Sequence, residues 1–222
     1  MRKLFLFCAV CAVGTFFLMD DFMKKSTNVV ASEIASSPAD ESNPLLAEWT
    51  GDFGGTPPYD KVKVAHFKPA LEKGMELNLA EIDAIASSKD APTFENTIAA
   101  MEKTGSVLDR VSTVYYVFAG TMGSKELDGV QAEMNVKLAA FGDKITQNEK
   151  LFKRIEAVYK SPESKKLTSE QQRLTWRYYT NFVRAGAQLT PEKKARLSEI
   201  NQKLAGLYTN FSQHLLADES DL

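Results

Sequence analysis

The sequence predicts an all-α protein, built of antiparallel helices joined by short loops. Three observations lead to this prediction. After Pro58, apolar residues recur in steps of three and four almost to the end of the chain, which is the spacing of an amphipathic helix face. Residues that cap helices stand before four of these stretches. The sequence contains no paired strand pattern, no Asn-Gly hairpin and no repeat at a fixed period.

Composition narrows the class of protein. A chain of 222 residues with 44% apolar and 25% charged residues is ordinary for a soluble globular protein of one large or two small domains. The net charge of -2 is spread evenly, and no basic stripe with interleaved aromatic residues appears. We therefore expect no binding of nucleic acid.

The N-terminus has the pattern of an export signal. Positive charge on Met1-Arg2-Lys3 precedes an uncharged apolar run, Leu4–Met19. The run is shorter than the roughly 20 residues that span a bilayer as a helix. Residues 1–25 are predicted to be a signal peptide. An uncleaved signal anchor stays open, because the small-residue site Val29-Val30-Ala31 lies well past the run. The predicted location is the periplasm or cell envelope of a bacterium, with the cytoplasm as the alternative.

Both cysteines, Cys8 and Cys11, lie inside this apolar run, so no disulfide is expected elsewhere. Their spacing resembles CxxC, but a signal core lacks the ligand-rich setting of a redox or zinc site. Residues 26–42 are small, polar and Pro-containing, which predicts a linker. Residues 43–58 are rich in Gly and Pro, which predicts an irregular lead-in segment. Its apolar residues are expected to pack on the helical domain: Leu45, Leu46, Trp49 and Phe53.

Each helix is predicted from its apolar face and its start signal. The first spans His66–Ala86, with Phe67, Leu71, Met75, Asn78, Ile82 and Ile85 on one face. The second begins after the N-cap Thr93 and carries a stripe to Phe118, with Gly105 as a break. The third follows Ser124, with Leu127, Val130, Met134, Leu138 and Phe141. The fourth spans Asn148–Tyr159, with Leu151, Phe152, Ile155 and Tyr159.

The last two helices carry the clearest start signals. Thr168 and Gln171 form a capping box for a helix that ends near Gly186. Thr190 as N-cap and Pro191 as first helical residue begin the sixth helix. Its apolar stripe is Leu197, Ile200, Leu204, Leu207, Phe211 and Leu215. Neither Gly nor Pro follows as a stop signal, so we expect the chain to be truncated and the partner of the stripe to lie further on.

Few residues suggest chemistry. The two histidines, His66 and His214, are far apart in sequence and no HExxH motif is present, so both are expected at the surface or its boundary. The basic run Lys193–Arg196 is expected to be a solvated helix face. Four aromatic residues could line a peptide-binding groove, but at helical spacing a core position is favoured: Trp176, Tyr178, Tyr179 and Phe182. The residues alone assign no catalytic, cofactor-binding or metal-binding side chain.

Several segments nevertheless resemble a known family. They are Asn43-Pro44-Leu45-Leu46, Pro57–Val62, Phe67–Met75, the PTFENTI segment Pro92–Ile98 with Met101-Glu102-Lys103, and the FVRAGAQL segment Phe182–Leu189. In this order they resemble the N-terminal part of bacterial peptidyl-dipeptidase (dipeptidyl carboxypeptidase), in the thimet oligopeptidase family of zinc metallopeptidases. The set covers nearly everything from residue 43 to the end.

The resemblance implies a mostly helical enzyme with a deep channel, whose N-terminal helices wall and cover the cleft. A later catalytic portion would carry HExxH, and two His and one Glu would hold Zn²⁺ while the glutamate of HExxH activates the bound water. No position here matches these residues. Residues 43–222 are therefore expected to be a helical N-terminal domain that is inactive alone and meets short oligopeptides only through the full-length enzyme. The membrane is expected to be contacted only through the N-terminal signal.

Two alternatives stay open. Related oligopeptidases share this architecture, so the resemblance leaves both a dipeptidase and an endopeptidase mode. The chain could also be a stand-alone helical binding or scaffold protein, or an inactive gene remnant. The open stripe of the last helix argues against a stand-alone domain, because several large apolar side chains would be exposed unless a partner subunit covered them.

Overall fold

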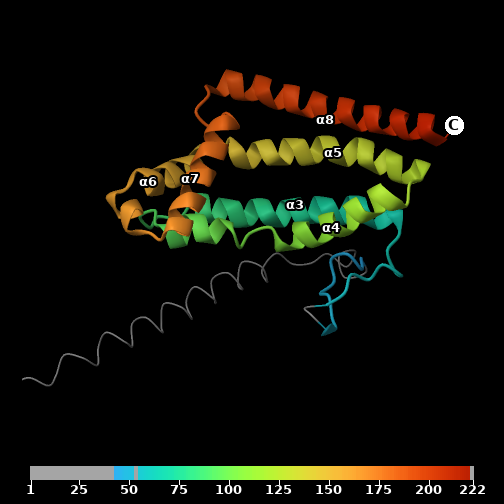
Figure 1. The fold of residues 1–222 in the computed structure, drawn as a ribbon, viewed down its shortest axis with the longest axis horizontal. Coiled ribbons are helices and arrows are strands. Elements are labelled where there is room, and N and C mark those ends of the chain that lie inside the picture. Colours follow the sequence, from blue (N-terminus) through green and yellow to red (C-terminus); the bar gives the residue numbers. More distant parts are fainter. Residues whose placement is uncertain (1–42, 53–54, 221–222) are drawn as a thin grey trace, which may run out of the picture. The chain divides into compact units, whose positions relative to one another are not determined.

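The computed structural model describes residues 43–52 and 55–220, so the predicted signal, linker and Phe53 lie outside the described residues. Within these ranges the chain is helical and has no strand, which confirms the all-α prediction (Figure 1). None of the helices there is both long enough and apolar enough to span a membrane. The elements are α3 (Val64–Ala86), η2 (Phe94–Ala99, a π-helix), α4 (Ser106–Thr121), α5 (Lys125–Thr146), α6 (Glu149–Lys160), η3 (Pro162–Lys166, a 3₁₀-helix), α7 (Ser169–Arg184) and α8 (Pro191–Ser220).

The capping residues begin the helices as predicted. The Thr93 hydroxyl accepts a hydrogen bond from the Asn96 amide at 3.1 Å. Thr168 accepts from the Gln171 amide at 3.3 Å, and the Gln171 side chain accepts from the Thr168 amide at 3.1 Å, which completes the capping box. Gly105, with a φ of 82°, separates η2 from α4. The π-helical geometry of η2 and the turn η3 were not predicted.

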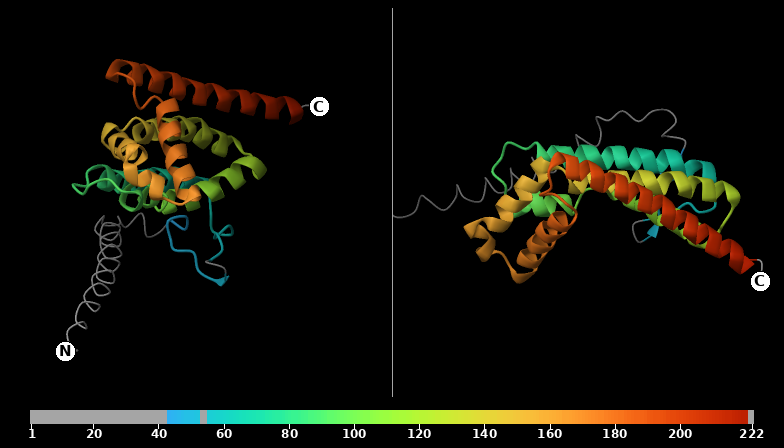
Figure 2. Two further views of the ribbon diagram at one scale, coloured as in Figure 1. Left: turned by 60° about the vertical axis from the view of Figure 1, so that its left-hand side comes forward. Right: turned by 90° about the horizontal axis from the view of Figure 1, so that it is seen from above.

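Contacts between helices show their directions. Gly74 of α3 lies against Leu108 of α4, and Phe67 lies against Tyr115, so α3 and α4 are antiparallel. α6 and α7 also pack together, as do α5 and α8 (Figure 2). The ion pair Lys68–Glu133, at 2.8 Å, joins α3 to α5, and Glu72–Lys137 joins them one turn further on. From one pair to the next, the residue number rises by four in both helices, so α3 and α5 run in the same direction. α4, which is antiparallel to α3, connects them.

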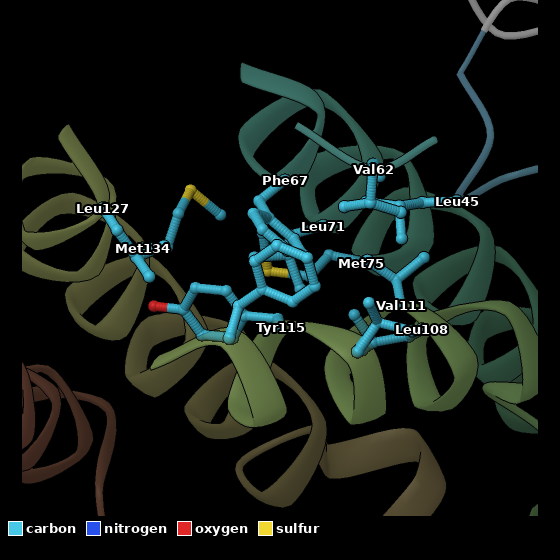
Figure 3. Packing of buried hydrophobic residues seen from close by; sticks show 13 residues of the cluster. Leu45, Val62, Phe67, Leu71, Met75, Leu108, Val111, Tyr115, Leu127 and Met134 are labelled. Atoms are coloured by element: carbon cyan, nitrogen blue, oxygen red, sulfur yellow. The ribbon is translucent and has the colours of Figure 1, made fainter. Parts of the chain in front are cut away.

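A first hydrophobic core lies where α3 packs against α4 and α5 (Figure 3). The lead-in segment closes it, since Leu45 is fully buried and Leu46 and Trp49 pack beside it. The Asn43 side chain holds this segment in place by donating to the His66 carbonyl at 2.9 Å. The predicted packing is thus confirmed for the three described apolar residues. The buried members are Leu45, Val62, Phe67, Ala70, Leu71, Met75, Leu108, Val111, Val114, Tyr115, Phe118, Leu127 and Met134.

A second core lies at the C-terminal end of α3, between η2, α6 and α7. Phe152 of α6 stacks on Tyr179 and Phe182 of α7, with ring centroids 5.9 and 6.5 Å apart. The buried members are Ile82, Ala86, Ile98, Met101, Leu151, Phe152, Ile155, Val158, Phe182 and Ala187. α3 contributes to both cores and so connects the two ends of the helical region.

The buried phenol of Tyr115 makes stability depend on alkaline pH. Its hydroxyl donates to the Asn135 side-chain oxygen at 3.3 Å. Burial, with a smaller contribution from Tyr116, raises the pKa of Tyr115 to about 12. In the unfolded chain a tyrosine loses its proton near pH 10. Between about pH 10 and 12 the unfolded state therefore binds fewer protons than the folded state, and stability falls as pH rises.

We expect the urea midpoint of unfolding to fall steadily above about pH 10. The Tyr115→Phe variant is expected to show a weaker fall, measured alongside tyrosinate absorbance. Some dependence should remain in the variant, because burial and the hydrogen bond to Glu102 also raise the pKa of Tyr178. Equal pH profiles for the variant and the original chain would contradict this prediction.

Candidate functional site

The residues considered for metal binding are not brought together. The His66 ring nitrogen Nδ1 accepts from the Lys63 amide at 3.1 Å at the start of α3. His214 is exposed on α8. No group of three or more His, Cys, Asp or Glu side chains that could hold a metal ion occurs among residues 43–52 and 55–220. The described side chains therefore do not fit the zinc ion that the resemblance implies, and no catalytic step follows from them.

The four aromatic residues of α7 separate into two environments. Phe182 is buried, and Tyr179 stacks on Tyr159 with centroids 4.3 Å apart. The Tyr178 hydroxyl donates to the Glu102 carboxylate. These three residues pack in or against the second core, as the favoured interpretation predicted. Trp176 is the exposed member of the four.

Trp176 lies on a basic face that the aromatic spacing did not reveal. The Arg173 guanidinium lies 4.3 Å from the Trp176 ring centroid. An open depression of about 540 Å³ is lined in part by Arg173, Trp176, Arg177 and Arg184. All its lining residues belong to α7, so it is a shallow surface with no second wall. Exposed arginines on one helix face are well solvated, and this face alone defines no ligand.

α8 packs on α5 through its polar face. Four hydrogen bonds made by side chains follow this seam, from one end of α8 almost to the other. At the centre the approach is close, because Gly206 lies against Val136. The bonds are Lys194 to the Gln147 carbonyl (3.2 Å), Asn201 to the Asp143 carboxylate (2.8 Å), Asn135 to the Thr209 hydroxyl (3.0 Å) and Gln213 to the Asp128 carbonyl (3.0 Å).

The basic run at the start of α8 is only partly a solvated face. Lys193 is exposed, and Arg196 is exposed and pairs with Glu199 at 2.9 Å. These two residues confirm the prediction. Lys194 differs from the prediction, because its ammonium group donates a hydrogen bond to the Gln147 carbonyl at the C-terminal end of α5.

The apolar stripe of α8 is exposed for most of its length. Leu197, at its start, is half-buried beside Gly186. The following members expose between 40% and 64% of their surface, and we name them the α8 open face: Ile200, Leu204, Leu207, Phe211 and Leu215. Soluble monomeric proteins rarely expose a contiguous row of large apolar side chains of this kind. The α8 open face is therefore the candidate interaction surface of this chain, and Figure 1 shows α8 beside α5 at the edge of the helical region.

Comparison with known proteins places the chain among homologues of peptidases. No family model matches it. The dipeptidyl carboxypeptidase of Salmonella typhimurium is 36% identical over 176 residues, covering 79% of this chain and 26% of the relative. The dipeptidyl carboxypeptidase of Escherichia coli is 37% identical over 175 residues, with the same coverage of 79% and 26%. The organellar oligopeptidase A of Arabidopsis thaliana is 26% identical over 192 residues, covering 85% of this chain and 22% of the relative.

These identities confirm the resemblance that the sequence motifs predicted. The chain is a homologue of peptidases, and it is 36–37% identical to the two dipeptidyl carboxypeptidases named above. It spans about a quarter of the length of the relatives it matches. The helical structure described here therefore corresponds to one part of those proteins.

Proposed function

We propose that residues 43–222 are the helical N-terminal part of a zinc peptidyl-dipeptidase that hydrolyses short oligopeptides. The observation that carries the proposal is the 36–37% identity, over 79% of the chain, with two proteins named dipeptidyl carboxypeptidase. The oligopeptidase A relatives are less similar, at 26% identity for the Arabidopsis protein, which favours the dipeptidase mode over the endopeptidase mode.

In this proposal the chain's contribution is steric. The zinc ligands and the catalytic glutamate belong to the portion of the enzyme that these 222 residues do not cover. The helices wall the substrate channel and restrict its entrance to unfolded, short peptides. Two closed hydrophobic cores support this role, because a wall must keep its shape without contact from substrate. Export to the periplasm through residues 1–25 is part of the same proposal.

A chimaera tests the proposal. The matched region of the Escherichia coli relative is replaced by the corresponding residues of this chain, and the zinc content and the release of dipeptides from an oligopeptide are measured. We expect the chimaera to bind zinc and to release C-terminal dipeptides. An oligopeptide with a blocked C-terminus is the matched control for the dipeptidase mode. A chimaera that folds and binds zinc but cleaves no peptide would overturn the proposal and favour the stand-alone binding protein.

The 222-residue chain by itself is the second arm of this test. We expect it to bind no stoichiometric zinc and to hydrolyse no oligopeptide, because its described residues hold no group of metal ligands. Metal content by mass spectrometry of the purified chain and a peptide-cleavage assay measure both properties. Detection of either zinc or cleavage would show a site elsewhere in the chain.

A further inference from the structure

The α8 open face has the spacing of a helix-packing seam. Ile200, Leu204, Leu207 and Phe211 follow one another at intervals of four, three and four residues. This is the 3.5-residue period at which two helices interlock their side chains along a common seam. A sheet edge or an extended peptide would instead meet side chains at a period of two. The face is thus shaped to receive another amphipathic helix.

The helix cannot bury this face by turning. The polar seam with α5 extends from Lys194 to Gln213 and holds the opposite side of α8. Rotating the open face towards α5 would break those hydrogen bonds and leave groups such as the buried Asp143 without their partner. The orientation of α8 is therefore set by its polar side, which leaves its apolar side exposed.

We propose that the α8 open face seats an amphipathic helix of the peptidase portion that the relatives have in addition to the matched region. This inference rests on the proposed function. The relatives are about four times as long as the region they share with this chain, so they carry enough further sequence to cover the face. The α8 open face itself consists of large apolar side chains, which suits a partner bound by apolar contact.

Paired substitutions in the chimaera described above test whether the α8 open face packs against a helix of the peptidase portion. Leu204→Gln with Phe211→Gln removes two apolar contacts from the α8 open face. Val117→Gln with Tyr116→Gln is the matched control on α4, because the exposed fractions are 42% and 64% in the first pair and 42% and 58% in the second. We expect the α8 pair to reduce peptide cleavage by about tenfold and to lower the temperature of half-inactivation. The α4 pair should change neither.

Failure of this inference differs from failure of the proposed function. An unsubstituted chimaera without activity would overturn the proposed function. An active chimaera in which the α8 pair of substitutions behaves like the α4 pair would overturn the inference that the α8 open face binds a helix. In the isolated 222-residue chain, neither pair should lower the urea midpoint, since all four side chains are exposed there. A lowered midpoint for the α8 pair alone would show that the face already packs within the chain.

Thiol labelling gives a direct structural readout. Leu207→Cys and Tyr116→Cys, with exposed fractions of 54% and 58%, are labelled with a maleimide in a background where Cys8 and Cys11 are serine. In the isolated chain both positions should react at similar rates. In the chimaera, position 207 should be protected by about tenfold while position 116 stays reactive. Equal reactivity at position 207 in both proteins would overturn the inference that the α8 open face is covered in the chimaera. Protection in the isolated chain that grows with its concentration would identify a second copy as the occupant instead.

Discussion

Replacing Arg154 with methionine is expected to lower the free energy of unfolding by about 3 kcal/mol. Arg154 is only 6% exposed. Its guanidinium donates to the carbonyls of Ser88 and Asp90 at 3.1 and 2.9 Å, and to the Asn96 side-chain oxygen at 3.0 Å. These bonds tie α6 to η2 and to the segment between α3 and η2. Methionine fills a similar volume but leaves the acceptors without this donor in a poorly solvated site.

Urea unfolding followed by far-UV circular dichroism measures this loss. The matched control is Lys153→Met on the same helix. Lys153 is 70% exposed and pairs with the equally exposed Glu149, so its loss is expected to change stability by less than about 1 kcal/mol. Similar midpoints for the two variants would show that the buried guanidinium does not hold the α3–η2 segment in place.

Replacing Gly74 with alanine is expected to lower the free energy of unfolding by about 2 kcal/mol. A Cβ atom at position 74 would lie 2.9 Å from the Cα of Leu108 and 3.2 Å from its Cβ. The nearest atom belongs to the α4 backbone, which cannot turn aside as a side chain can. α3 and α4 would have to separate and loosen the first core around them.

The control variant is expected to change the free energy of unfolding in the opposite direction. Gly129 lies inside α5, and a Cβ there would meet nothing within 4 Å. Gly129→Ala should therefore raise the free energy of unfolding by about 0.5 to 1 kcal/mol, because alanine favours the helix over the unfolded chain. Thermal unfolding of both variants measures the difference. Stabilisation by Gly74→Ala would show that the α3–α4 contact is not as close as described.

Local signals explain why the helices were predictable. Capping at Thr93, Ser124 and Thr168 is made by side chains within three residues of the helix start, so it can be recognised without knowing the fold. The break at Gly105 is local too, because its φ of 82° suits glycine. The π-helical turn η2 was missed. Its tertiary setting includes Arg154 of α6, which bonds to Asn96, and such a contact leaves no mark on the spacing of apolar residues.

The candidate surface was predictable only in part. Periodicity identified the stripe from Leu197 to Leu215, but it did not show which side of α8 would meet α5. In α7, spacing grouped Trp176 with Tyr179 and Phe182, whereas the structure buries Phe182 and leaves Trp176 exposed beside Arg173. Separating these residues requires knowing where α6 packs, and that depends on contacts between residues far apart in the chain.

The sequence by itself determined the all-α class, the helix starts and the similarity to dipeptidyl carboxypeptidases, because capping, apolar period and identity are carried by the order of residues. The tertiary structure alone decided that α3 and α5 run in the same direction and that α8 binds α5 by its polar face. The physical reason is that an amphipathic pattern gives a helix two distinct sides. Which side is buried depends on the hydrogen bonds and close packing that a neighbouring helix offers.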